Sequence, residues 1–178
     1  AHLARRPAQE RRQRQMRLGL DAHRRLTLFV TCAVAVILAI MPFPTWAEPF
    51  RPDWVGLVLI YWCLAMPERY SVGTGWLLGF IQDVLYGSLL GSNALGKTLV
   101  AFLTVRLHLQ LRMFPRWQQA VSIFGLLIAN QLLVLWIRGA IGQAPETFIY
   151  WTPSIVGALL WPWLFVILRD LRRRGSIT

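Results

Sequence analysis

Charged residues are scarce in this sequence, which argues against a soluble globular domain. They make up 15% of its 178 residues, whereas soluble domains carry about 25%. Apolar residues make up 56% of the chain and occur in long blocks. A soluble fold of this size would leave such blocks partly exposed to water, whereas the hydrocarbon core of a membrane accommodates them. The composition therefore predicts an integral membrane protein.

Acidic residues are also few, so the chain carries a formal net charge of +11. A strongly basic chain can indicate nucleic-acid binding, but the positions of the cations argue against it. Eight arginines lie in the first 25 residues, and four more lie between Arg169 and Arg174. Both clusters flank apolar segments, which is typical of cytoplasmic anchoring and of contact with anionic lipids. We predict anionic lipids as partners and no nucleic acid.

Cysteine and histidine are rare, and neither is arranged for a known chemistry. Cys32 and Cys63 both lie inside apolar blocks, which argues against a disulfide framework or a zinc site. The three histidines, at positions 2, 23 and 108, form no His-Glu-x-x-His motif. Asp83 is the one acid deep in an apolar segment, whereas an intramembrane aspartyl protease needs two. We predict no enzymatic activity, cofactor or metal.

The apolar residues form six segments, which predict an all-α protein with six transmembrane helices. The segments cover residues 26–43, 54–66, 72–91, 94–111, 119–137 and 152–168. With the N-terminus in the cytoplasm, sixteen Lys and Arg residues fall inside and three fall outside, as the positive-inside rule requires. The second segment is short for a span, but only an even number of crossings keeps both Arg-rich ends in the cytoplasm.

The loops between these segments are short, so the sequence predicts a single membrane domain. It covers residues 26–168, between a basic cytoplasmic arm at 1–25 and a basic cytoplasmic tail at 169–178. The sequence does not begin with Met, and Met16 is an alternative start. We therefore assign no function to residues 1–15.

Four glycines and one aspartate form a repeat of four residues along the third segment. The repeat consists of Gly75, Gly79, Asp83, Gly87 and Gly91. On a helix this spacing forms one stripe, and glycines let another helix approach closely. Two interpretations are open, namely packing within the chain's own bundle and a docking face for another protein.

Asp83 stands near the middle of this segment, where a charge costs roughly 2.5–3.5 kcal/mol on insertion scales. We therefore expect its side chain to face the bundle interior. The expected partners are Lys97, Asn130 and Gln131. Asp83 then has three possible roles: a polar knot that fixes helix register, a contact with a partner protein, or proton or substrate handling.

The predicted outer hairpin between the first two segments is stiffened by prolines and carries charges. Its sequence is Glu48-Pro49-Phe50-Arg51-Pro52-Asp53-Trp54. It is either a turn with a Trp anchor at the membrane interface or a rigid contact surface.

Several of these motifs, taken in order, resemble the MreD family of rod shape-determining proteins of Gram-negative bacteria. The resemblance extends from about Leu26 to Arg174, although no single motif is diagnostic. The motifs are Arg51-Pro52-Asp53-Trp54, Tyr61-Trp62, Pro67, Val72-Gly73-Thr74-Gly75, the Asp83, Gly87-Ser88, Leu90-Gly91 run, Trp117-Gln118-Gln119-Ala120 and Leu160-Trp161-Pro162-Trp163.

The resemblance implies a non-enzymatic inner-membrane component of the cell-elongation complex, which builds the peptidoglycan of the lateral wall. It implies binding to the periplasmic scaffold MreC and work with MreB, RodA and the elongation-class penicillin-binding protein. It also implies a fold similar to the six-helix substrate-capture subunits of vitamin uptake transporters. We place the expected MreC contacts at the stripe from Gly75 to Gly91 and at Arg51, Pro52 and Trp54.

A second function stays open at this point, that of a transporter subunit which captures a small molecule. It predicts a polar cavity near the outer face, built around Asp83, Lys97 and Asn130.

Overall fold

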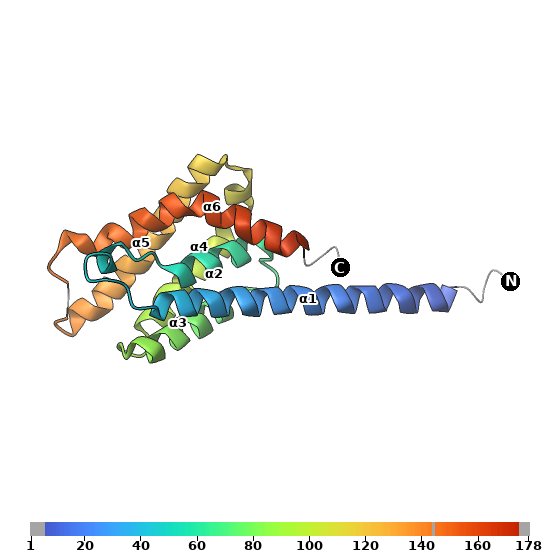
Figure 1. Cartoon of the computed structure of the whole chain (residues 1–178), viewed down its shortest axis with the longest axis horizontal. Coiled ribbons are helices and arrows are strands. Elements are labelled where there is room, and N and C mark those ends of the chain that lie inside the picture. Colours follow the sequence, from blue (N-terminus) through green and yellow to red (C-terminus); the bar gives the residue numbers. More distant parts are fainter. Residues whose placement is uncertain (1–5, 144, 175–178) are drawn as a thin grey trace.

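A computed structural model describes residues 6–143 and 145–174, and helices are the regular structure of these residues (Figure 1). Its six α-helices overlap the six predicted segments, which confirms the all-α fold. They are α1 (Arg6–Ile40), α2 (Trp54–Ala65), α3 (Val72–Tyr86), α4 (Ser92–Met113), α5 (Arg116–Ala140) and α6 (Thr152–Arg174). Two short 3₁₀ turns, η1 (Glu48–Phe50) and η2 (Phe148–Trp151), precede α2 and α6.

The helices run back and forth between two ends of the bundle. The first residues of α1 and the last residues of α6 lie toward the same end (Figure 1), which we call the terminal end. The connections 41–53, 87–91 and 141–151 lie at the other end, which we call the cavity end. The N-terminal half of α1 extends beyond the rest of the bundle (Figure 1).

Helix α2 lies at the centre of the bundle, which explains why it is apolar on every face. All residues from Val55 to Leu64 are buried, and α2 packs against α1, α3, α4 and α6. A helix that is apolar on every face is stable only when other elements surround it. At about 1.5 Å per residue, its 12 residues are shorter than the ~30 Å hydrocarbon core of a bilayer.

The outer surface of the bundle is apolar. On α1, small side chains such as Cys32, Ala35 and Ala39 are buried, whereas Phe29 and Ile37 are 69% and 63% exposed. Three described stretches are long and apolar enough to cross a membrane, namely Ala22–Ile40, Arg116–Ala140 and Phe148–Arg174. A soluble protein rarely exposes so much contiguous apolar surface, so the chain is a membrane protein.

The basic arm and tail are continuous with the first and last helices. Helix α1 begins at Arg6, so the described part of the arm and the first apolar segment form one continuous helix. Helix α6 continues to Arg174, six residues past the predicted end of the membrane domain. Residues 1–5 of the arm and 175–178 of the tail lie outside the described residues.

Candidate functional site

The third helix is shorter than the glycine repeat predicts. Helix α3 ends at Tyr86, and Gly87 follows it with a φ of 59°. The Gly87 amide bonds to the Val84 carbonyl and the Ser88 amide to the Asp83 carbonyl, a pattern that commonly ends helices at a glycine. Gly91 also has a positive φ, of 100°. The prediction of one helical stripe is therefore wrong at Gly87 and Gly91, which lie in the turn to α4.

The other two glycines of the repeat bring α3 against α4. A Cβ atom at position 79 would lie 2.5 Å from the Ala94 Cα atom. A Cβ atom at position 75 would lie 2.6 Å from the Lys97 carbonyl oxygen. Gly75 and Gly79 are therefore buried in a helix pair of their own chain, and their closest neighbour is the backbone of α4.

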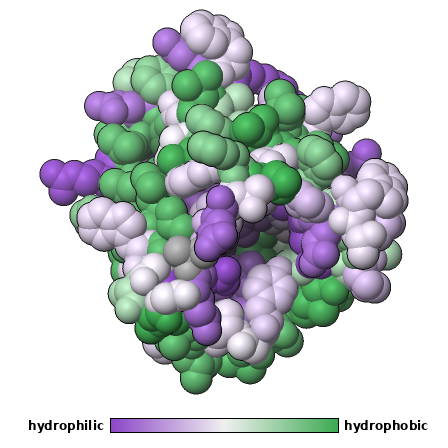
Figure 2. Space-filling view, turned by 90° about the vertical axis from the view of Figure 1, so that its left-hand side faces the viewer, coloured by the Kyte–Doolittle hydropathy of each residue, from purple (hydrophilic) through white to green (hydrophobic). Residues whose placement is uncertain are grey.

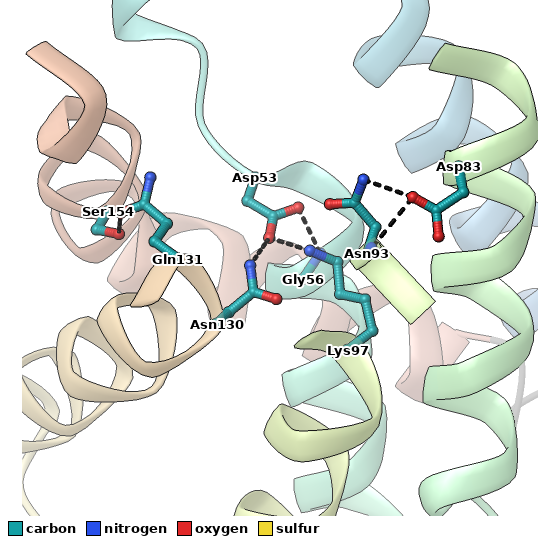
Figure 3. Close-up of polar contacts among 8 residues, drawn as sticks. All are labelled: Asp53, Gly56, Asp83, Asn93, Lys97, Asn130, Gln131 and Ser154. Atoms are coloured by element: carbon teal, nitrogen blue, oxygen red, sulfur yellow. Dashed lines mark hydrogen bonds and ion pairs between the residues drawn. The ribbon is translucent and has the colours of Figure 1, made fainter. Parts of the chain in front are cut away.

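Asp83 lies in the last turn of α3 and caps the first turn of α4 (Figure 3). Its fully buried carboxylate accepts six hydrogen bonds, three from backbone amides and three from side chains. The amides are those of Gly91 at 2.9 Å and of Asn93 and Ala94 at 3.1 Å; the side-chain donors are Ser88 Oγ at 2.8 Å, Ser92 Oγ at 3.1 Å and Asn93 Nδ2 at 2.9 Å. Helix N-termini carry unpaired amides and a partial positive charge. The carboxylate is thus satisfied without a cation.

The expected partners of Asp83 are therefore wrong. Lys97 pairs with Asp53 instead, and Asn130 also donates to Asp53, at 3.4 Å. Gln131 accepts a hydrogen bond from Ser154 Oγ on α6 and donates one to the Tyr150 carbonyl in η2 at 2.8 Å. The reason is that Asp83 lies beside the start of α4, within reach of free amides.

Asp53 and Lys97 form a partly buried ion pair that the sequence did not indicate (Figure 3). Asp53 stands just before α2, where its side chain also accepts the Gly56 amide at 3.0 Å. Lys97 is 1% exposed. A buried ion pair offsets the cost of desolvation only when further hydrogen bonds complete it, and Gly56 and Asn130 supply them. Only the predicted topology could have indicated this pair, because it places both residues on the same side of the membrane.

A polar cavity of about 240 Å³ opens beside this pair at the cavity end. Figure 2 shows this end of the molecule, with hydrophilic side chains around a hollow. The described lining residues are Arg51, Pro52, Asp53, Gln82, Tyr86, Asn93, Lys97, Leu127, Asn130, Gln131, Val134, Arg138, Tyr150, Pro153 and Ser154. Three cations and one acid among them leave the lining with an excess of two positive charges. Two buried oxygens there, Gln82 Oε1 and Asn130 Oδ1, lack a hydrogen-bond partner within the described chain.

The hairpin residues singled out in the sequence hold the hairpin in place. Arg51 donates to the Met41 carbonyl at 2.6 Å at the end of α1 and lies over the Phe43 ring at 5.4 Å. Pro52 is buried, and Trp54 is the half-buried first residue of α2. These three side chains therefore position the exposed tip of the hairpin, which includes Trp46 and Phe50.

The site contains paired charges, capped helices and a small cavity. Within residues 6–143 and 145–174, no group of three His, Cys, Asp or Glu side chains is placed to hold a metal ion. The arrangement can recognise polar or anionic groups at the cavity mouth, and it fixes how the helices meet there.

Comparison with known proteins gives one consistent result. The family model described as "rod shape-determining protein MreD" matches residues 22–171. The "Rod shape-determining protein MreD" of Haemophilus influenzae is 33% identical over 156 residues, which cover 85% of this chain and 92% of the relative. No solved structure matches the chain significantly.

Proposed function

Because the chain belongs to the MreD family of rod shape-determining proteins, we propose that it is a non-enzymatic scaffold of the inner-membrane complex that builds the lateral cell wall. A role in determining rod cell shape follows from the family. The specific proposal is that it binds MreC and, through MreC or directly, joins MreB, RodA and the elongation-class penicillin-binding protein. The short connections and tightly paired helices support a scaffold.

We propose that all six helices cross the inner membrane, with both termini in the cytoplasm. The positions of the cations support this orientation. Arg69, Arg112 and Arg116 lie in or beside connections at the terminal end, together with the basic arm and tail, whereas Arg51, Lys97 and Arg138 lie toward the cavity end. The cavity end would then face the periplasm. Helix α2 would cross inside the bundle, where its neighbours complete the apolar thickness.

We propose that MreC contacts the connections at the cavity end. Of the predicted contact stripe, Gly75 and Gly79 face α4, so a partner would meet the turn that contains Gly87 and Gly91. The hairpin 41–53 is the second surface, and Arg51, Pro52 and Trp54 act by positioning it. Trp46 is 76% exposed and Phe50 is 56% exposed on this hairpin. Aromatic side chains are enriched at protein–protein interfaces, and Trp is among the residues that most often carry their binding energy.

Replacing Trp46 by alanine is expected to reduce MreC recovery at least fivefold when the two proteins are co-purified from membranes. The matched control is Trp136→Ala, because Trp136 is equally exposed, at 77%, but lies on α5. The control is expected to keep MreC, since Trp136 lies outside the hairpin. Equal recovery with both variants would remove the hairpin from the proposed interface.

The polar cavity favours a second candidate function, the capture of a small molecule. Lys97 and Asn130 line the cavity as that function predicts, whereas Asp83 does not. The volume of the cavity, about 240 Å³, is below the usual range of about 300–1,000 Å³ for ligand pockets. Thermal stabilisation of the purified protein by a vitamin-like compound would favour this candidate; the scaffold function predicts none.

A further inference from the structure

A second cleft, of about 300 Å³, lies at the terminal end between α2, α4, α5 and α6. We call it the basic cleft. The described residues that line it are Tyr61, Leu64, Ala65, Arg112, Gln119, Phe165, Arg169 and Arg172. Three of these side chains are guanidinium groups, and none of them is acidic. The lining of the cleft therefore concentrates positive charge at one end of an apolar bundle.

One of the three arginines is committed to the fold, which leaves the other two to explain. Arg112 donates to the Leu64 carbonyl at 2.9 Å and to the Ala65 carbonyl at 2.9 Å, so it caps the end of α2. Arg169 Nε is buried and makes no hydrogen bond within the described chain; its charge is paired with the Asp170 carboxylate, 3.8 Å away. Arg172 lines the cleft one turn further along α6. Arg116 adds a guanidinium 6.0 Å from the Phe165 ring.

A buried hydroxyl also points to a missing ligand. Tyr61 is 2% exposed, and its ring packs edge-on against Trp62 and Phe165 at 5.7 Å and 5.6 Å. Its Oη atom has no hydrogen-bond partner among the described residues. Buried polar atoms are almost always paired in folded proteins. A phenol hydroxyl and a guanidinium nitrogen without a hydrogen bond, both in one cleft, can donate to the same oxygen-rich anion.

We propose that the basic cleft binds the phosphate group of an anionic membrane phospholipid. Guanidinium groups bind phosphate with paired, charge-assisted hydrogen bonds, and the Tyr61 hydroxyl supplies a further donor. Apolar side chains that suit the start of an acyl chain line the same cleft, namely Leu64, Ala65 and Phe165. This site is more specific than the general attraction of Arg-rich ends to anionic lipid.

The test is native mass spectrometry of the full-length protein in detergent with added phosphatidylglycerol or phosphatidylethanolamine. The parent protein is expected to retain phosphatidylglycerol at least fivefold more than phosphatidylethanolamine, because only the former is a net anion. Arg172→Gln is expected to reduce phosphatidylglycerol retention about tenfold. Tyr61→Phe, which keeps the ring packing, is expected to reduce it about threefold.

Arg173→Gln is the matched control, since it removes the same charge from the next residue of α6, outside the cleft lining. It is expected to change retention less than twofold. Equal losses with Arg172→Gln and Arg173→Gln, or no preference between the two lipids, would overturn the proposal. Displacement of the lipid by millimolar inorganic phosphate would assign the cleft to a soluble phosphate compound and would overturn the lipid assignment.

Discussion

Replacing Asp83 by leucine is expected to lower the free energy of unfolding by about 4 kcal/mol, the largest effect we predict for one substitution. The carboxylate accepts hydrogen bonds from three backbone amides at the start of α4 and from three side-chain donors. Losing a helix cap costs about 1 kcal/mol, and each buried donor left unpaired costs about 1–3 kcal/mol. Leucine removes the cap and leaves several buried donors unpaired.

The measurement is denaturant unfolding of the purified protein in detergent micelles. Ser88→Ala is the matched comparison, because it removes only one of the six donors, and it is expected to cost about 1 kcal/mol. A similar small loss for both substitutions would mean that Asp83 does not hold α3 and α4 together.

Adding one methyl group at Gly79 is expected to cost about 3 kcal/mol. In Gly79→Ala the new Cβ atom would lie 2.5 Å from the Ala94 Cα atom and from the Asn93 carbonyl oxygen. Both atoms belong to the backbone of α4, so the helices must move apart, and overpacking of this kind costs about 1–3 kcal/mol or more. The shift would also move the Asn93 and Ala94 amides away from Asp83.

Gly73→Ala separates this clash from the general effect of alanine in a helix. Gly73 lies on the same helix, and a Cβ atom there would meet nothing within 4 Å. Since alanine favours helix over glycine by about 1 kcal/mol, this variant is expected to unfold at the same or a higher denaturant concentration. If Gly79→Ala were as stable as Gly73→Ala in the same titration, α3 and α4 would not be in close contact.

Helix positions could be predicted from the sequence because apolar blocks and their flanking charges reflect one large effect, the favourable transfer of apolar side chains into lipid. The short second segment follows the same rule, since α2 is apolar on every face and lies in the centre. The end of α3 could not be predicted in this way. Gly87 fits both a helical stripe and a left-handed turn, and spacing contains no information about φ.

The polar contacts of the candidate site depend on that helix end. If α3 continued to Gly91, Asp83 would stand in mid-membrane and require a cation, which is why Lys97 is the partner expected from the sequence. With α3 ending at Tyr86, Asp83 meets the free amides of α4, and Lys97 is available to Asp53. In the sequence, Asp53 stands only at the edge of an apolar segment. The pair with Lys97 follows from the fold, because the start of α2 and the start of α4 lie at the same end of the bundle.

The orientation of the bundle is the central claim, because the proposed MreC surface at the cavity end depends on which end faces the periplasm. Single cysteines at two exposed positions test it, one at Gln143 in the cavity-end connection and one at Glu68 in the terminal-end connection. The native Cys32 and Cys63 are buried and should give little background. A membrane-impermeant maleimide added to cells with a permeable outer membrane is expected to label Gln143→Cys and to leave Glu68→Cys unlabelled until lysis. The reverse pattern, or labelling of both cysteines in intact cells, would contradict the proposed topology.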